Sequence, residues 1–253
     1  MIKGLYAAFT AMQSSWRYYD LLSNNVANVS TPGYKREVAS NQAFSDVLLS
    51  RQTPVPSPLS ARIQDIVGQI GTGKLLTDFT TDFAQGAFQT SGNEFDLATG
   101  RGFFAVQTPD GNTFYTRDGR FGRDAEGTLV TSHGYLVLNA QGGRIRLPAE
   151  SVTVDADGVI SREGQAIDQL QVLDFTPGQL SRAGAAFFSA TGAGVQVAGG
   201  VRQGVLELSN ATLIDDLTTL LTVHRAYQAN QTVLSKLDMT LDQAAGQLGT
   251  FGR

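Results

Sequence analysis

Each end of this chain carries a hydrophobic stripe, with steps that alternate between four and three residues. The first stripe comprises Leu5, Phe9, Met12, Trp16, Tyr19, Ser23 and Val26. The second comprises Leu213, Leu217, Leu220, His224, Tyr227, Gln231, Leu234, Asp238, Leu241, Ala245 and Leu248. Such spacing keeps one side of a helix turned toward a partner helix. It predicts helices over residues 2–27 and 212–248. Gln231 and Asp238 are then polar positions that set the register of the second helix. A chain with two such helices is more typical of an assembly subunit than of an enzyme.

Composition argues against several classes of protein. The chain has 253 residues, a formal net charge of -4 and no cysteine. Nucleic-acid binders are usually basic, and no basic stripe is visible. Without cysteine there are neither disulfides nor thiolate metal sites. No run approaches the roughly 18 apolar residues that span a bilayer, so we expect no membrane span. Lys3, Thr10 and Gln13 interrupt the start, and we therefore expect no cleavable signal peptide.

Between the helices the sequence is typical of β-structure. From residue 101 to about 207, short apolar runs are separated by turn pairs that favour hairpins. These pairs are Asp110-Gly111, Asp118-Gly119, His133-Gly134, Gly142-Gly143 and Asp157-Gly158. The fold class predicted is mixed α+β, with the terminal helices packed as a coiled-coil-like α-domain and a central, mainly antiparallel, meander-like β-domain. The predicted domains are 1–35 with 208–253 (inner helical), 36–80 (linker or extended segment) and 81–207 (β-rich, outer).

Turn and cap signals mark the helix ends. Asn24, Asn25 and Asn28 suit a helix C-terminus, and Pro32-Gly33 is a strong turn signal, because proline fixes one φ and glycine permits a positive one. At the second helix, Thr212 is a candidate cap, and acidic residues 215 and 216 fall in the first turn, where the helix dipole favours negative charge. Three prolines within residues 53–58 predict an extended connector.

Few residues suggest chemistry. The segment from Gly68 to Lys74 has phosphate-loop glycine spacing, but Leu75 stands where a serine or threonine would bind magnesium. We interpret it as a surface loop and keep a nucleotide-dependent enzyme as the weaker alternative. Acidic residues 155, 157 and 163 have the wrong spacing for a calcium loop and fit a hairpin turn. The two histidines, 133 and 224, lack zinc-ligand spacing. We predict no catalytic residue, no cofactor, no metal site and no small-molecule substrate.

Several segments, in order along the chain, resemble one protein family. They are residues 21–35 at the start, 85–97, 102–104 and 115–119 in the centre, and 206–210 with 224–230 near the end. Together they resemble the bacterial flagellar basal-body rod family, of the FlgF/FlgG type among the rod and hook axial proteins. The C-terminal motif positions are Ser209, Asn210, Arg225, Tyr227 and Asn230.

The resemblance implies a structural subunit of the periplasm-spanning rod of the flagellar basal body. Such a subunit is exported unfolded by the flagellar export apparatus without a cleaved signal. It forms a homo-polymer and also joins other rod and hook axial proteins. Its terminal helices form the inner layer of a shaft that transmits torque for motility, and its β-domain forms the outer layer.

Combining the stripes with this resemblance gives a set of candidate site residues. The expected assembly interface comprises Leu5, Phe9, Met12, Trp16, Tyr19, Leu217, Leu220, Tyr227, Leu234 and Leu241. The expected turn out of the inner helix comprises Asn24, Asn25, Asn28, Pro32 and Gly33. Removing the first ~30 residues should then abolish polymerisation and leave the β-domain folded. The main alternative is a β-rich binding module that dimerises through a helix pair, which predicts a closed oligomer instead of a filament.

Overall fold

The chain forms two compact units. The computed structural model describes residues 2–43, 47–54, 62–70, 74–176 and 178–250. The helical unit comprises residues 1–24, 37–80 and 214–253, and the β unit comprises residues 25–36 and 81–213. The chain therefore passes between the units after residues 24, 36, 80 and 213. The inner and outer domains predicted from the sequence describe positions of these segments in an assembled structure. Their arrangement therefore stays a prediction.

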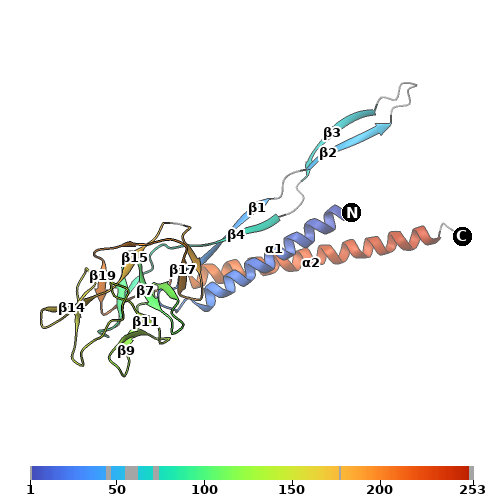
Figure 1. Cartoon of the computed structure of the whole chain (residues 1–253). Helices are drawn as coiled ribbons and strands as arrows, with labels where there is room; N and C mark the ends of the chain where they lie inside the picture. The colour runs from blue at the N-terminus through green and yellow to red at the C-terminus, as the bar shows by residue number, and fades with distance from the viewer. Residues whose placement is uncertain (1, 44–46, 55–61, 71–73, 177, 251–253) are drawn as a thin grey trace. The chain divides into compact units, whose positions relative to one another are not determined.

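Both predicted helices are present (Figure 1). Helix α1 spans Ile2–Ala27 and helix α2 spans Leu213–Thr250, with Asp215 and Asp216 in the first turn of α2 as expected. The strands between them pair antiparallel wherever the register is defined, so the mixed α+β class is confirmed. The coiled-coil-like character of the helix packing stays a prediction.

Within the helical unit, α1 and α2 lie side by side and run in opposite directions (Figure 1). A side chain at Gly4 would meet Leu237, and the Tyr19 ring lies 6.3 Å from the His224 ring, so positions early in α1 face positions late in α2. Two strand pairs belong to the same unit. Strand β1 (Glu37–Ala43) pairs with β4 (Lys74–Thr81), and β2 (Val47–Pro54) pairs with β3 (Arg62–Ile70). The predicted connector thus begins inside β2, and residues 55–61 lie outside the described residues.

Among the described residues, the β unit contains sixteen short strands. They are β5 (Phe88–Thr90), β6 (Leu97–Thr99), β7 (Phe103–Gln107), β8 (Thr113–Thr116), β9 (Phe121–Arg123), β10 (Leu129–Thr131), β11 (Leu136–Val137), β12 (Thr153–Val154), β13 (Val159–Arg162), β14 (Gln165–Gln169), β15 (Val172–Asp174), β16 (Leu180–Arg182), β17 (Phe187–Ala190), β18 (Val195–Gln196), β19 (Val201–Gln203) and β20 (Val205–Glu207). The largest sheet has nine strands, of which seven follow the order β16-β17-β8-β7-β11-β10-β9. Strand β15 joins that sheet through β7, and β18 joins it through β15.

The meander prediction is wrong in its strand order. Strand β17 pairs with β8, and β15 pairs with β7, across long stretches of sequence. The last two strands also return to much earlier ones, β19 to β6 and β20 to β5. Strands of two to five residues bury little surface through sequential hairpins alone. Pairing between distant strands closes a shared core that includes Phe104, Val137, Ile145 and Leu170, all of them fully buried.

Three of the five predicted turn pairs connect consecutive antiparallel strands, and Gly142-Gly143 lies within the isolated antiparallel bridge of Leu138 with Arg144. Residues 110–111 join β7 to β8, residues 133–134 join β10 to β11, and residues 157–158 join β12 to β13, each as an antiparallel hairpin. The pair Asp118-Gly119 does not form a hairpin, because β8 pairs with β17 and β9 pairs with β10. Gly119 instead packs against the backbone of Leu97, whose N–H donates a hydrogen bond to the Gly119 carbonyl (2.9 Å). A Cβ on Gly119 would lie 1.5 Å from the Leu97 carbonyl oxygen.

The close approach predicts unequal effects at two neighbouring glycines. Gly119→Ala should destabilise the β unit by roughly 2–4 kcal/mol, because the backbone of β6 must move away from the new methyl group. Gly122→Ala, in β9, is the matched control, because no atom lies within 4 Å of its added Cβ. It should be neutral or slightly stabilising. Urea unfolding of both variants measures the difference, and equal midpoints would contradict the packing of Gly119 against Leu97.

Candidate assembly surface and the junction of the terminal motifs

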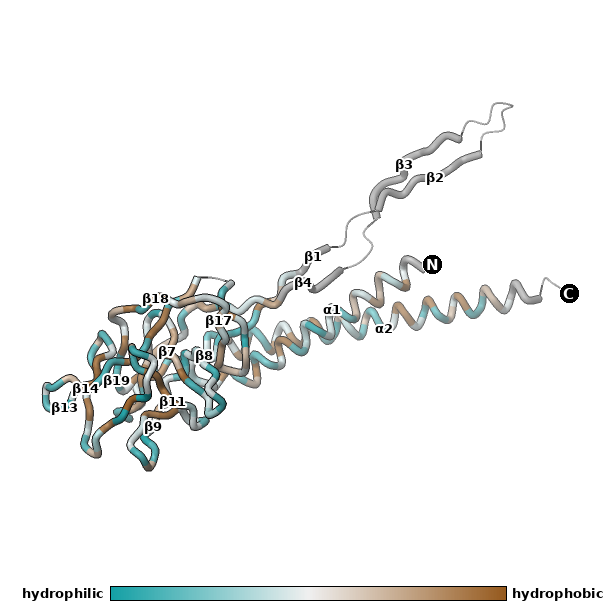
Figure 2. The backbone as a smooth tube through the Cα atoms, in the orientation of Figure 1, coloured by the Kyte–Doolittle hydropathy of each residue, from teal (hydrophilic) through white to brown (hydrophobic). Residues whose placement is uncertain are grey.

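Helix α1 has two apolar faces of different character. One face carries small side chains, among them Ala8 and Ser14, and is buried within the helical unit. The other carries aromatic side chains that solvent reaches, with exposed fractions of 53% for Tyr6, 56% for Phe9 and 59% for Trp16. Hydrophobic and hydrophilic residues alternate along both helices in Figure 2. A helix with apolar side chains on opposite faces requires a second partner to bury the outer one.

Helix α2 has half-buried positions in steps of four and three, as a paired helix requires. They are residues 220, 223, 227, 230, 234, 237, 241 and 244. Every second one belongs to the predicted stripe, and each of the others lies one residue earlier than predicted. His224, Gln231 and Asp238 are therefore exposed. The structure does not support the expectation that Gln231 and Asp238 occupy the helix seam.

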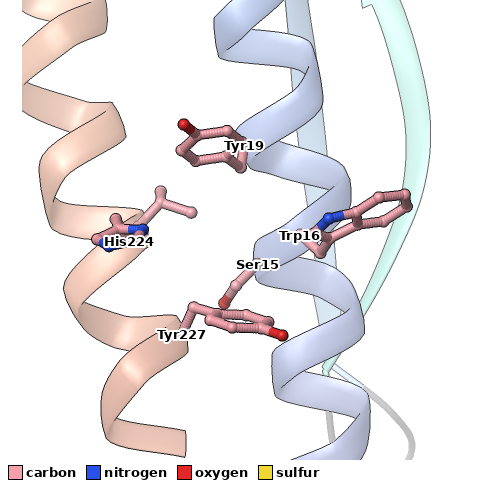
Figure 3. A pocket seen from close by; sticks show the side chains of 6 residues that line it. Ser15, Trp16, Tyr19, His224 and Tyr227 are labelled. Carbon is pink, nitrogen blue, oxygen red and sulfur yellow. The ribbon is translucent and has the colours of Figure 1, made fainter. Parts of the chain in front are cut away.

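An open groove of about 280 Å³ lies along α1 and α2 within the helical unit. Its lining includes Trp16, Tyr19, His224 and Tyr227. Tyr19 and Tyr227 occupy the space between the two helices, whereas Trp16 points away from α2 (Figure 3). The groove is thus lined by Tyr19 and Tyr227 between the helices, and it reaches the exposed Trp16 on α1.

The expected interface residues divide into two groups. Phe9, Trp16, Tyr19 and Leu217 are exposed. The other six are partly buried within the helical unit: Leu5, Met12, Leu220, Tyr227, Leu234 and Leu241. The first group is available to another molecule, and the second contributes to packing inside the unit.

The predicted turn begins inside the last turns of α1, and from Asn25 to Gly33 it belongs to the β unit and packs tightly there. Gly33 has a φ of 69°, and a Cβ at this position would lie 2.2 Å from the Asp118 backbone nitrogen. Its N–H donates a hydrogen bond to the Glu207 carbonyl oxygen (2.8 Å). The buried Asn25 accepts a hydrogen bond from the Tyr34 hydroxyl (3.0 Å), which folds the segment back on itself. Asn24, Asn28 and Pro32 lie on the same stretch and are not fully buried.

Directly after this turn lies a buried charge cluster of Lys35, Glu207 and Arg117. Lys35 Nζ donates to Glu207 Oε1 (2.6 Å), and Arg117 Nη1 donates to Glu207 Oε2 (3.1 Å). The side chains of Lys35 and Glu207 are 0% exposed, and that of Arg117 is 8% exposed. The N–H of Gly86 also donates to Glu207 Oε1 (2.9 Å). Both carboxylate oxygens thus receive charged donors away from water, where such bonds are strong.

Surrounding contacts complete the cluster. Lys35 Nζ also donates to the carbonyl oxygen of Ala84 (2.8 Å), and Arg117 Nη1 donates to that of Thr99 (3.2 Å). The Arg117 guanidinium lies 4.8 Å from the centre of the Phe103 ring, a cation–π distance. Burial is the main cause that lowers the pKa of the Lys35 ammonium, and the hydrogen bond to Glu207 opposes it.

Asn210, from the C-terminal motif, joins three segments through one side chain. Its Oδ1 accepts the N–H of Arg36 (2.8 Å), and its Nδ2 donates to the carbonyls of Asp82 (2.8 Å) and Ala84 (3.0 Å). The neighbouring Ser209 Oγ accepts the N–H of residue 211 (3.1 Å). The other motif positions, Arg225, Tyr227 and Asn230, lie on α2 instead.

Sequence reasoning missed the charge cluster. Lys35, Glu207 and Arg117 each fall inside a motif segment, but nothing in the spacing shows that they meet. A signal was present in principle at two of the three places, because Lys35 and Glu207 are each the single charged residue of their motif segment. The structure shows that the motif segments at both ends and in the centre converge on one point.

Two of the other candidate sites, the acidic hairpin and His133, have structural explanations. The centre of the glycine loop, residues 71–73, lies outside the described residues. Asp155 Oδ1 accepts the N–H groups of Asp157 (3.0 Å) and Val159 (2.9 Å), as expected of a hairpin turn. The His133 ring packs edge-on against Phe187 at 5.4 Å. Within the described ranges no cluster of three or more potential ligands is suited to a metal ion. No helix among those residues is long and apolar enough to cross a membrane.

The fold and these surfaces define a structural protein whose terminal helices expose apolar side chains. Three family models match the chain: Flagella basal body rod protein over residues 5–35, Flagellar hook protein FlgE/F/G D1 domain over 98–162, and Flagellar basal body rod FlgEFG protein C-terminal over 202–247. The flagellar basal-body rod protein FlgG of Bacillus subtilis is 32% identical, over 96% of this chain and 98% of the relative.

Two further relatives agree. FlgG of Agrobacterium fabrum is 33% identical over 94% of this chain and 96% of its own length. FlgF of Caulobacter vibrioides, also a flagellar basal-body rod protein, is 29% identical over 100% of this chain and 99% of its own. The chain belongs to the flagellar basal-body rod protein family and is a structural rod protein of the flagellum.

The pair Arg36–Asp82, beside the cluster, predicts a dependence of stability on pH. Hydrogen bonds from the Ala84 N–H and the Arg36 guanidinium hold the pKa of the Asp82 carboxyl below its usual value of 3.8. A depressed pKa stabilises the fold at pH values above 3.8, and the effect is lost as the pH falls through the lower folded-state pKa. Asp82→Asn should therefore unfold at a lower temperature than the wild type at pH 7, and the gap should close on acidification. Melting curves from pH 7 to pH 2 measure it, and a gap independent of pH would contradict this assignment.

Proposed function

We propose that this rod protein polymerises helically, with further copies of itself and with other rod and hook proteins, through its terminal helices. The resulting shaft transmits torque for motility. The observation that carries the proposal is the aromatic face of α1, where Tyr6, Phe9 and Trp16 are each more than half exposed. Several large apolar side chains exposed along one helix are typical of an interaction site.

The energetics favour burial of that face between copies. Covering an aromatic side chain stabilises a complex by roughly 1.5–3 kcal/mol, and several such side chains recur along one helix. Exposed apolar residues also begin α2, with Ile214 79% and Leu221 59% exposed. Two different apolar surfaces on one chain suit a heterologous contact, which extends into a helical filament when its rotation does not close a ring.

The candidate residues take separate roles in this proposal. Phe9, Trp16, Tyr19 and Leu217 contact neighbouring subunits. The partly buried members of the set pack α1 on α2 in a coiled-coil-like inner domain. Its predicted bounds, residues 1–35 and 208–253, include the short segments 25–35 and 208–213, which fold with the β unit. Residues 24–33 shape the exit from that domain, residues 36–80 extend from it, and residues 81–207 form the outer layer. The relatives carry the names of structural rod proteins, and the proposal assigns this chain no reaction.

The location of the subunit and its route of export follow from the same proposal. The subunit lies in the periplasm-spanning part of the basal body, and the flagellar export apparatus delivers it without cleaving a signal. Intact-mass spectrometry of the protein recovered from purified basal bodies tests the route. A mass that lacks the first helix would contradict it.

Removing aromatic side chains should weaken polymerisation selectively. The double variant Tyr6→Ser/Phe9→Ser should raise the critical concentration at least ~10-fold, because the two side chains lose several kcal/mol of burial. Gln13→Ser is the matched control, because Gln13 is exposed on the same helix and is polar. Trp16 is the single tryptophan of the chain, so a blue shift of its emission together with sedimentation reports assembly. If the double variant and Gln13→Ser polymerise alike, this interface is wrong. A closed dimer at every concentration would favour the binding-module alternative.

The boundary between the two units indicates where a truncation should end. The β unit begins at residue 25, so a deletion of 30 residues would remove Asn25 and the turn that holds Gly33. Deletion of residues 1–24 should abolish polymers and leave the melting transition of the β unit unchanged. Electron microscopy and circular dichroism check the two halves of this prediction, and filaments formed by the truncated chain would contradict it.

A further inference from the structure

The chain passes between its two units four times, and three of these passages begin or end within a few residues of the buried charge cluster. The passages follow residues 24, 36, 80 and 213. Lys35 and Arg36 immediately precede the second passage, and Asp82 closely follows the third. Glu207 and Asn210 precede the fourth. All of these residues belong to the β unit, so their contacts are internal to it, whatever the arrangement of the two units.

We propose that Lys35, Arg117, Glu207 and Asn210 form a clasp that ties the four chain passages together, so that force entering the β unit at one of them is shared by all. The clasp is a property of the folded monomer. Its importance for torque rests on the proposed rod function, but its existence does not, and it can be tested without a polymer.

The first two passages are tied through the segment of residues 25–36. Asn25 and Tyr34 are hydrogen-bonded to each other, so the start of this segment is held to its end. The Gly33 N–H and the Lys35 ammonium then attach the segment to the backbone and the side chain of Glu207, respectively. A pull on α1 is thereby transferred to strand β20 without first extending residues 25–36.

The third and fourth passages are tied through Asn210 and Ala84. The Ala84 carbonyl accepts both the Lys35 ammonium (2.8 Å) and the Asn210 amide (3.0 Å). Asn210 also holds the Arg36 N–H, and the N–H of Asp82 donates to the Arg36 carbonyl (2.9 Å). Hydrogen bonds therefore link residues 35–36, 82–84 and 210 to one another. These bonds act in parallel, so a force on one segment is divided among them.

Burial explains why such a clasp resists force. The side chains of Lys35 and Glu207 are fully buried, so water does not compete for their bond as it would at the surface. Opening the clasp separates a charged pair in a poorly solvating interior, which is strongly unfavourable. Arg182 adds a further hydrogen bond, from its guanidinium to the Lys35 carbonyl, and stacks on the Tyr34 ring at 4.8 Å.

The clasp contains two cations and one carboxylate, so removing a cation and removing the carboxylate should have different effects on stability. Two cations, Lys35 and Arg117, share one carboxylate, and Asp82 attracts Lys35 more weakly. Lys35→Met leaves Glu207 paired with Arg117 and Gly86, and it leaves the Ala84 carbonyl bonded to Asn210. Glu207→Gln instead leaves both cations buried without their counter-charge, which is the costly case.

Thermal unfolding of the full chain tests the charge pattern. Glu207→Gln should lower the melting temperature of the β unit by roughly 10 °C, and Lys35→Met should lower it by clearly less. The double variant Lys35→Met/Glu207→Gln should melt above Glu207→Gln alone, because one unpaired cation has been removed. A double variant that melts lower than either single variant would overturn the clasp.

Single-molecule pulling then separates a clasp from an ordinary stabilising contact. The chain has no cysteine, so Gln13→Cys in α1 and Asp110→Cys in the turn after β7 provide unique attachment points. With the clasp intact, residues 25–36 should be released only together with the β unit. In Glu207→Gln they should be released earlier and at lower force, in a step of about 40 Å at ~3.5 Å per residue. Val106→Ala, a fully buried core position, serves as a control of reduced stability. If it gives the same early step, or if Glu207→Gln gives none, the inference is wrong.

Discussion

The Glu207 carboxylate holds distant segments of this chain together through its ion pairs. It is buried completely, receives Lys35 from the N-terminal motif and Arg117 from the central one, and accepts the Gly86 backbone. A buried carboxylate without partners would destabilise the fold strongly, so these segments must be in place together. This requirement explains why residues that follow the first helix fold with the strands, and why the last strand returns to one of the earliest.

The two units meet different physical demands. The β unit closes its own core around Phe104 and Ile160 and satisfies its buried charges internally. The helical unit buries the small-residue face of α1 and leaves Phe9 and Trp16 in solvent. Stability is thereby concentrated in the strands, and unsatisfied apolar surface is concentrated in the helices. This division suits a subunit of the rod family, since a monomer with a self-sufficient β unit remains folded while its helices await partners.

Much of the local structure was predictable from the sequence. The four-and-three spacing identified both helices nearly to the residue, and the turn pairs at 110–111, 133–134 and 157–158 identified hairpins, because helix periodicity and turn chemistry act over a few residues. The pair Asp118-Gly119 was misread, since a glycine required for close packing against Leu97 has the same sequence signature as a glycine in a turn. The spacing in α2 was also displaced by one residue at alternate positions. Both choices share Leu220, Leu234 and Leu241, and between these leucines Val223 and Leu237 are half-buried one residue before the predicted His224 and Asp238.

Residue spacing, turn chemistry and the motif segments were enough to predict the class of fold, the two helices, most of the hairpins and the family. The strand order, the outward-facing aromatic side of α1, and the meeting of Lys35 with Glu207 across 172 positions of sequence became visible only in the folded chain. The difference lies in the range over which each cause acts. Backbone propensity and periodic burial are set by near neighbours, whereas a buried ion pair depends on the simultaneous placement of distant segments, which local spacing does not record.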